Sequence, residues 1–405
     1  MEFTLPDLDF LTSEQGQRVL QRLAREDISD TRRMRVLTAL RKELNMTQAA
    51  AALETALLRK KAVEKFGAAA QQMFFTREAL EQASSQLVRG YRAKRYFTEI
   101  KTGSGTILDV CCGIGSDALA FAELSEGHHV IGLDWDLVRV RMAALNAAAC
   151  GLTNVEFSAA DVTRGIPAAD LLFFDPARRT DEGKRIFDVE GYEPPLSLIQ
   201  QWTHIGRMIV KLAPGVDVSQ LKPYGGAVEF ISVSGELKEA VLWRGFGWQG
   251  SQATVIRHDS ALHLGTESQA AAPVGPPQRW LCEPDPAVLR AGLVQALAAR
   301  FGGTLLDDTI AYFTTAERPQ GEWAGLLRAW QILDWIPFNL KKLISYLRAE
   351  GVGHITIKKR GVPMTPDELL PRIKLEGEHT RTLVLTRHGG DSIVLICADY
   401  GEADA

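Results

Sequence analysis

Residues 106–117, Thr-Ile-Leu-Asp-Val-Cys-Cys-Gly-Ile-Gly-Ser-Asp, join an apolar strand to an acidic residue and a Gly-x-Gly turn. Glycine lets the backbone turn tightly and lets a ligand approach main-chain N–H groups, because no Cβ intervenes. Asp109 ends the strand, Cys111 is a small residue in the turn, and Gly113 and Gly115 are its glycines. The same turn opens many nucleotide-binding α/β sheets, so it predicts a ligand site without naming the ligand.

Two further acids follow strand-like segments, and together with Asp109 they favour S-adenosylmethionine. That donor needs a carboxylate for its ammonium and sulfonium, an acceptor for its ribose hydroxyls, and another for its adenine amine. Asp134 stands 19 residues after Gly115 and suits the ribose, while Asp161 follows the next strand and suits the adenine. Each acid alone could instead cap a helix or end a solvated loop. Three acidic strand ends in register favour the donor site.

A dinucleotide is the alternative ligand. Gly113-x-Gly115-x-x-Ala118 satisfies the lax dinucleotide fingerprint, and Asp134 could equally accept from a nicotinamide ribose. The positions of Asp109 and Asp161 favour the methyl donor.

The segment Leu-Leu-Phe-Phe-Asp-Pro-Ala-Arg-Arg, residues 171–179, delivers an acid, a proline and two arginines from a buried strand. Methyl transfer mainly requires that a nucleophile be placed in line and that its proton be managed. Asp175 and the carbonyls of Pro176 or Ala177 could accept hydrogen bonds from an amino group and orient its lone pair. Arg178 and Arg179 could hold a phosphate or carboxylate, or one of them could only fix the loop.

Tyr192, in Tyr-Glu-Pro-Pro, is expected to wall the substrate crevice, either by stacking on a base or by packing within the loop. The five cysteines follow no disulfide or zinc spacing, no histidine is placed to activate one, and no metal site is expected.

The elements that must position these residues read as helices, then alternating strands and helices, then a second mixed region. We predict an N-terminal helical domain (1–72), an α/β core with a parallel, doubly wound sheet (73–265), a linker (266–278) and an α+β region (279–405). The core strands are predicted at 106–110, 129–134, 154–158, 170–175, 207–213, 228–233, 238–243 and 253–258. The last region reads as βαββαβ, a ferredoxin-like order, followed by a helix and a hairpin.

A helix predicted from Thr76 through Tyr96 carries four basic residues in its C-terminal half, namely Arg89, Arg92, Lys94 and Arg95. They indicate either a solvated face with favourable charge at a helix end or an RNA contact.

Composition and charge limit the partners and the location that can be expected for this chain. The chain has 405 residues and a net charge of −4, with +4 in residues 1–100, −6 in 101–280 and −2 in 281–405. Any nucleic-acid contact is therefore expected to be local, through patches on the flanking domains. No apolar run approaches the roughly 18 residues that span a bilayer, and no secretory signal is visible. We expect a cytoplasmic protein with reduced thiols and no membrane partner.

The chain resembles the class I S-adenosylmethionine-dependent methyltransferases. More narrowly, it is similar to a bacterial group of RNA-type methyltransferases with a C-terminal THUMP-like domain. The matching stretches are the Gly turn, Asp-Pro-Ala-Arg-Arg (175–179), Met-Phe-Phe-Thr-Arg-Glu-Ala-Leu-Glu-Gln-Ala (73–83), Tyr-Glu-Pro-Pro-Leu (192–196) and Ile-Lys-Lys-Arg-Gly-Val-Pro (357–363). The Asp-Pro-Ala-Arg segment departs from the Asn/Asp-Pro-Pro-Tyr of amino-directed methyltransferases, which counts against base stacking there.

The resemblance implies methyl transfer to RNA, with Lys358, Lys359 and Arg360, together with Lys341 and Lys342, as RNA contacts. A basic strand end capped by Gly361 is the other interpretation of residues 358–360. A methyltransferase for a small molecule or a protein, or a non-catalytic module that binds donor and RNA, remains an alternative function.

Overall fold

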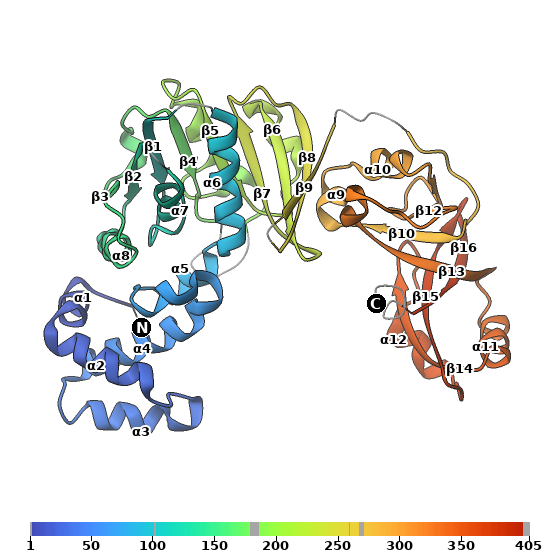
Figure 1. Cartoon of the computed structure of the whole chain (residues 1–405), viewed down its shortest axis with the longest axis horizontal. Helices are drawn as coiled ribbons and strands as arrows, with labels where there is room; N and C mark the ends of the chain where they lie inside the picture. The colour runs from blue at the N-terminus through green and yellow to red at the C-terminus, as the bar shows by residue number, and fades with distance from the viewer. Residues whose placement is uncertain are drawn as a thin grey trace. The chain divides into compact units, whose positions relative to one another are not determined.

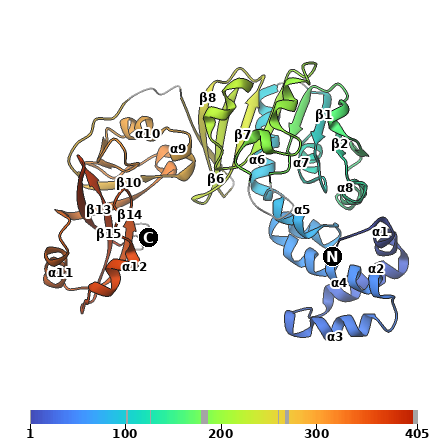
Figure 2. The same cartoon turned by 180° about the vertical axis from the view of Figure 1, so that it is seen from behind.

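The computed structural model describes residues 2–100, 103–125, 127–178, 186–258, 260–266 and 271–399. Contacts within the chain divide it into two compact units. The first comprises residues 1–227 with 240–248, and the second comprises 228–239 with 249–405. Figure 1 labels their elements, and Figure 2 shows the same elements from behind.

Four helices open the first unit: α1 (Leu5–Thr12), α2 (Glu14–Arg25), α3 (Asp30–Leu40) and α4 (Met46–Phe66). Capping boxes at Thr4 and Asn45 start α1 and α4, because each side chain accepts the otherwise unpaired N–H of the third helical residue. Gly67, with φ of 60°, ends α4. Apolar faces of these helices pack with Ile114, Leu119 and Met142, so their core continues into the sheet domain.

The helix predicted from Thr76 to Tyr96 is two helices, α5 (Arg77–Gln82) and α6 (Gln86–Ile100). Lys65 explains the break. Its Nζ donates to the carbonyl oxygens of Leu80, Glu81 and Ala83 at 2.7, 3.0 and 2.9 Å. An ammonium there satisfies carbonyls that would otherwise need a continuing helix.

A nine-stranded sheet follows, with the order β3-β2-β1-β4-β5-β7-β6-β8-β9. Its strands are β1 (Gly105–Val110), β2 (His128–Asp134), β3 (Val155–Ala159), β4 (Leu171–Phe174), β5 (Met208–Leu212), β6 (Ala227–Val233), β7 (Glu236–Arg244), β8 (Gly250–Arg257) and β9 (Ser260–Gly265). The first five strands pair in parallel, and β7 runs antiparallel to β5. The predicted doubly wound core is confirmed.

The strand order reverses between β1 and β4, and in such sheets the ligand crevice lies outside the carboxyl ends of the strands at that point. Helices α7 (Ser116–Leu124) and α8 (Leu137–Ala149) follow β1 and β2. Helix α6 crosses the sheet face that is toward the viewer in Figure 1 and away from the viewer in Figure 2.

The second unit carries a seven-stranded sheet with the order β11-β12-β10-β13-β16-β15-β14. Its elements are β10 (Trp280–Pro284), α9 (Pro286–Arg290), α10 (Val294–Arg300), β11 (Thr304–Leu305), β12 (Phe313–Thr315), β13 (Leu327–Pro337), α11 (Leu340–Ala349), β14 (Val352–Lys359), α12 (Pro366–Leu369), β15 (His379–His388) and β16 (Asp391–Cys397). The predicted mixed α/β elements are present. The hairpin β15–β16 is inserted between β13 and β14, so the βαββαβ strands are not contiguous in the sheet.

The predicted linker is described only in part, since residues 267–270 lie outside the described residues. The C-terminal end of the predicted linker is bonded to the sheet of the second unit. Val274 forms a bridge with Leu305, and the N–H of Gly275 donates to the carbonyl of Leu305 at 2.9 Å.

Candidate active site

The Gly turn between β1 and α7 is built from left-handed backbone. Cys111, Gly113 and Gly115 have φ of 63°, 55° and 83°. A Cβ added to Gly115 would lie 2.9 Å from the ring of Phe157, so this glycine is required for packing. A Cβ added to Gly113 would meet nothing within 4 Å. The backbone at Gly113 therefore borders open space that a ligand can enter.

Asp109 lies beneath this turn and is 1% exposed. Its Oδ2 accepts the N–H of Ala118 at 2.9 Å, whereas its buried Oδ1 has no hydrogen-bond partner among the described residues. Burial, together with the negative charges of Asp117 and Asp175, raises the pKa of Asp109 well above its ordinary value. A buried carboxylate oxygen without a partner is costly, and a cationic ligand would relieve that cost.

Asp134, at the end of β2, fixes the turn from the other side. Its Oδ2 accepts the N–H of Gly113 at 2.9 Å and its Oδ1 accepts the N–H of Asp136 at 3.0 Å. Burial raises the pKa of Asp134. A carboxylate has about four acceptor positions, so both oxygens can still accept hydroxyl donors. The next residue, Trp135, is 76% exposed. Our sequence analysis did not single out Trp135, although its place after the acid was a usable signal.

Asp161 lies in the loop after β3. Asp161 lies close to Asp134, because the preceding residue, Ala160, donates its N–H to the carbonyl of Asp134 at 2.9 Å. Its Oδ1 accepts from the N–H and hydroxyl of Thr163 at 3.1 and 2.6 Å, and these bonds lower its pKa. The carboxylate of Asp161 is therefore engaged by hydrogen bonds within its own turn. The backbone amides of the loop are the groups that remain to bind a ligand there.

Asp175 follows β4 at the edge of the sheet where the strand order reverses. Its Oδ2 lies 2.6 Å from Nζ of Lys211, and its Oδ1 lies 3.7 Å from the guanidinium of Arg178. Ala177 and Glu193 exchange two backbone hydrogen bonds, which fix the loop containing the buried Pro176. The predicted acid and Arg178 are thus brought together, while Arg179 lies outside the described residues.

Lys211 is a second residue that the sequence did not single out. It lies on β5 with 3% of its side chain exposed, and Nζ also donates to the carbonyl of Gln82 at 3.4 Å. The available signal was one lysine within the apolar strand Met-Ile-Val-Lys-Leu, residues 208–212.

Within the basic half of α6, Lys94 is exposed, whereas Arg92 lies neither on a solvated face nor on a surface for RNA. This arginine is 1% exposed and forms an ion pair with Asp117, the second residue of α7. Burial opposes ionisation of Asp117, but the positive charges of Arg92 and Lys211 outweigh it and lower the pKa. The guanidinium of Arg89 lies 4.2 Å from the centroid of the Phe66 ring, and that of Arg95 lies 4.2 Å from the Trp248 ring. These arginines support packing of the first unit.

Tyr192 is 1% exposed, and its hydroxyl accepts the N–H of Ala213 at 3.5 Å. The buried ring of Tyr192 packs inside the protein and presents no face on which a base could stack. Of its two expected roles, the structure fits loop packing.

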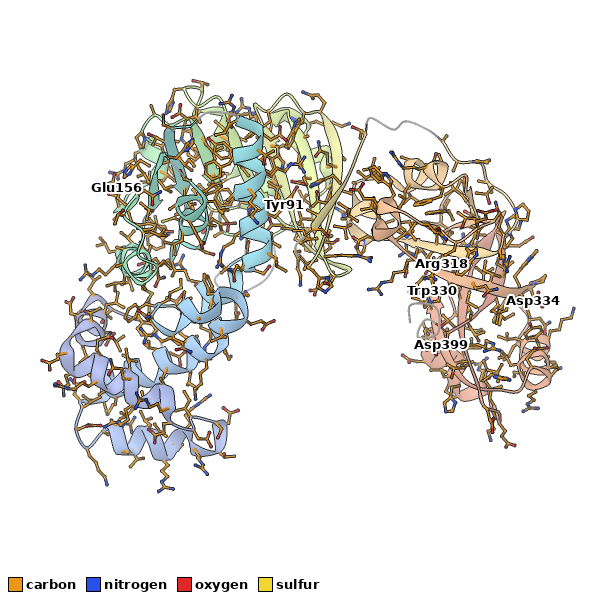
Figure 3. All side chains as sticks on the ribbon, in the orientation of Figure 1. Tyr91, Glu156, Arg318, Trp330, Asp334 and Asp399 are labelled. Carbon is orange, nitrogen blue, oxygen red and sulfur yellow. The ribbon has the colours of Figure 1, made fainter. Side chains whose placement is uncertain are left out.

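The predicted RNA contacts at the end of β14 differ from one another. Lys358 forms an ion pair with Glu283 and lies 4.3 Å from the ring centroid of Trp330, which Figure 3 labels. Arg360 lies 5.0 Å from the Tyr312 ring, whereas Lys359 is exposed. Lys358 is therefore engaged within the fold, and Lys359 is the one that offers an exposed charge.

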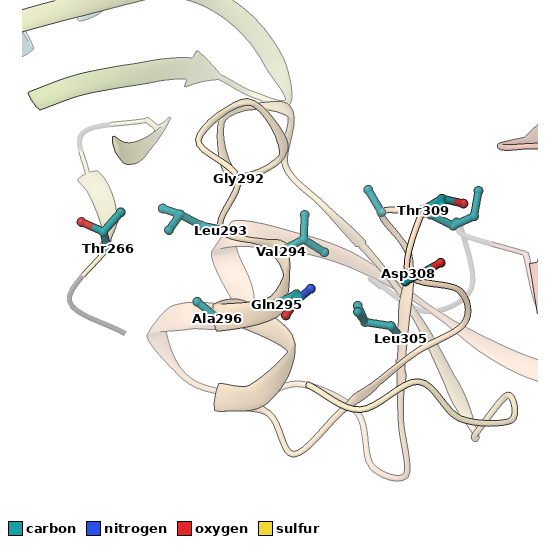
Figure 4. A pocket seen from close by; sticks show the side chains of 11 residues that line it. Thr266, Gly292, Leu293, Val294, Gln295, Ala296, Leu305, Asp308 and Thr309 are labelled. Atoms are coloured by element: carbon teal, nitrogen blue, oxygen red, sulfur yellow. The ribbon is translucent and has the colours of Figure 1, made fainter. Parts of the chain in front are cut away.

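A cavity of about 470 Å³ lies in the second unit, and no predicted site residue lines it. Its lining, drawn in Figure 4, comes from residues 292–296 at the start of α10, from 308–311, and from Thr266 and Leu305. Within the described ranges, no group of three or more His, Cys, Asp or Glu side chains is arranged to hold a metal. No helix of the described residues is long and apolar enough to cross a membrane.

Comparison with known proteins agrees with this geometry. Residues 101–182 match the methyltransferase domain family, 327–399 the THUMP domain-like family, and 4–62 a domain of unknown function. An uncharacterised S-adenosylmethionine-dependent methyltransferase of Mycobacterium tuberculosis is 33% identical over 354 residues, which cover 85% of this chain and 95% of that protein. An uncharacterised RNA methyltransferase of Caldanaerobacter subterraneus is 31% identical over 113 residues, covering 26% of this chain and 25% of that protein.

A solved structure from Porphyromonas gingivalis W83, described as a methyltransferase, shares the fold with a TM-score of 0.79 at 18% identity, covering 98% of this chain and 100% of that one. The chain belongs to the S-adenosylmethionine-dependent methyltransferases. It is an enzyme whose methyl donor is S-adenosylmethionine, as the Gly turn and Asp109 predicted, and it carries a C-terminal THUMP-like domain.

Proposed function

We propose that this methyltransferase modifies a base in structured RNA. The observation that carries the proposal is the set of exposed basic side chains on the THUMP-like region, namely Lys341, Lys342, Arg348, Lys359, Arg372 and Lys374. Lysine and arginine on one domain supply the phosphate contacts that position a nucleic acid without reading its sequence. The similarity to an RNA methyltransferase over 113 residues supports the same acceptor.

The residues of the Gly turn fit the donor. The unpartnered Oδ1 of Asp109 suits the donor's ammonium, and the open side of Gly113 admits the ligand to the main chain. Asp134 retains acceptor capacity for ribose hydroxyls, Cys111 is small enough to border the ligand, and the loop at Asp161 supplies amides for the adenine. Trp135 is placed to cover a planar group beside Asp134. The bound donor supplies an electrophilic methyl group on a sulfonium.

The loop after β4 is the part of the site that binds the methyl acceptor. Asp175 accepts a hydrogen bond from the N–H of the acceptor and so directs the nitrogen lone pair, and the carbonyl of Pro176 assists. When bound, the donor would supply the methyl group to the acceptor nitrogen and keep the electron pair of the carbon–sulfur bond on sulfur. The proton of the acceptor passes to Asp175. Arg178, and Arg179 beyond it, carry charge suited to a phosphate of the substrate.

The proposal places the enzyme in the cytoplasm. All five cysteines are free thiols, which is typical of proteins in a reducing compartment.

The test is a transfer assay with methyl-tritiated S-adenosylmethionine and an extract from cells lacking the gene, fractionated into RNA, protein and small molecules. We expect ribonuclease-sensitive label, and nucleoside analysis then identifies the modified atom. Asp175→Asn should abolish labelling while donor binding persists. Asp170→Asn is the matched control, because Asp170 lies at the other end of β4, where its Oδ2 accepts the N–H of Thr106 at 2.8 Å. Label confined to protein or small molecules would overturn the RNA acceptor and keep the enzyme.

A further inference from the structure

A row of charges lies buried on one face of the parallel sheet. Register pairs Asp109 with Phe173 and Phe173 with Ile209, so these side chains share a face. Two residues further along their strands, Asp175 and Lys211 continue on that face. Lys211 is thus brought to the Gly turn's side of the sheet at the carboxyl ends of the strands.

The charges on this face form two ion pairs and one acid without a counterion. Arg92 pairs with Asp117, and Lys211 pairs with Asp175, whereas Oδ1 of Asp109 has no hydrogen-bond partner in the described part of the chain. The lysine in the strand is therefore committed to the acid of the acceptor loop and not to the donor side.

Stability does not account for a lysine at this place. The other residues of β5, 208–210 and 212, are apolar and fully buried. Removing an ammonium from water costs several kcal/mol, and well-packed apolar residues often replace buried ion pairs without loss of stability. A methionine would fill the stem of Lys211 within an apolar strand. The pair with Asp175 therefore points to a role in the chemistry at that loop.

The two oxygens of Asp175 are placed unequally. Oδ2 is bound by Lys211 at 2.6 Å, whereas Arg178 lies 3.7 Å from Oδ1, which is too far for a hydrogen bond. The side chain of Asp175 is partly exposed, so Oδ1 is the oxygen that can accept from a substrate.

We infer that Lys211 is a positioning residue for methyl transfer, which anchors Oδ2 of Asp175 and leaves Oδ1 to the acceptor. The inference rests on the role proposed for Asp175. It does not rest on the acceptor being RNA.

Lys211→Met and Lys211→Arg test it, with the exposed Lys222→Met as the matched control. The acceptor is whichever fraction the wild-type enzyme labels, so a failure of the RNA proposal and a failure of this inference give different results. For Lys211→Met we expect kcat to fall about 100-fold, the scale of acid–base assistance. Donor Kd should stay within about threefold, since Lys211 is committed to the acceptor side. Lys211→Arg should restore part of kcat, because its guanidinium can still bind Oδ2 of Asp175.

A double variant guards against a purely structural explanation. If Lys211 acts through Asp175, Lys211→Met should cost little further activity in an Asp175→Asn background, because residues acting as a unit are not additive. Two results would overturn the inference: a folded Lys211→Met enzyme with kcat within threefold of wild type, or a loss of donor binding as large as the loss of kcat.

Discussion

Asp109 and Asp117 stand close together on the same buried face, yet replacing each by asparagine should change stability in opposite directions. Asp109 carries an oxygen without a hydrogen-bond partner among the described residues, and its charge is opposed by burial and by two other acids. Leaving a buried polar group unsatisfied costs about 1–3 kcal/mol. Asp109→Asn removes the charge while keeping an acceptor for Ala118, so the donor-free protein should become more stable. Each kcal/mol added to the free energy of unfolding corresponds to a rise in Tm of about 2–4 °C for a domain of 150–250 residues.

Asp109→Asn should weaken donor binding, although it raises the stability of the donor-free protein. Hydrogen bonds to charged groups contribute about 1.5–3 kcal/mol, and 1.4 kcal/mol is a factor of ten. Asp109→Asn should therefore weaken the binding of S-adenosylmethionine about 10- to 150-fold. Asp117→Asn removes the carboxylate of the buried ion pair with Arg92, and breaking such a pair typically costs about 3–5 kcal/mol. Thermal melts of donor-free protein and titration calorimetry with the donor measure both effects.

The raised pKa of Asp109 also gives a pH dependence with a definite sign. Above the ordinary carboxyl value of 3.8, the folded protein keeps a proton on Asp109 that the unfolded chain has lost. The contribution of Asp109 to stability therefore falls as pH rises from 3.8 to the raised value. A cationic donor favours the ionised carboxylate, so donor affinity should rise over the same window and level off above it. Asp109→Asn should flatten that rise. A lower Tm for this variant, or a donor Kd within threefold of wild type, would refute the reasoning.

Three further predictions concern single sites. Gly113→Ala should cost about 1–2 kcal/mol for a left-handed backbone, visible in a thermal melt, and should reduce donor affinity measured by calorimetry, because its methyl group points into the open space of the ligand. Unchanged affinity would show that the donor does not approach there. Trp135→Ala should change stability by less than about 0.5 kcal/mol and remove the tryptophan fluorescence response to donor, whereas a persisting response would place that signal elsewhere. Lys358→Ala should lower Tm by breaking the contacts with Glu283. Lys359→Ala should leave Tm unchanged and reduce the slope of log affinity for RNA against log salt by about 0.9; equal effects of the two variants on RNA binding would contradict this distinction.

Local sequence predicted well which strand ends carry the acids of the candidate site. A glycine turn, an apolar strand and a terminal acid are neighbours in the chain, so their geometry follows from short-range rules. Asp109, Asp134 and Asp175 accordingly lie at the ends of the strands expected to carry them.

The partners of buried charges could not be predicted in the same way. Lys211 and Asp175 are 36 residues apart, and Arg92 and Asp117 are 25 apart, so only strand order and helix placement bring them together. A basic helix end looks the same in sequence whether it faces water, RNA or an internal acid. For the same reason Lys358 resembled its exposed neighbour Lys359, until the fold placed Glu283 beside it.

Asn146 on α8 has a consequence for where this enzyme can be divided. Its buried amide accepts the N–H of Phe74 at 2.7 Å and donates to the carbonyls of Phe74 and Ile114 at 3.0 and 3.1 Å. One side chain thereby joins the segment that follows the N-terminal helices to the Gly turn. Cutting the chain before Phe74 would also uncover the apolar side chains that α4 now covers. The recognisable catalytic core is therefore the middle of a longer folding unit, and a shortened chain that begins there would lose the support of its own donor loop.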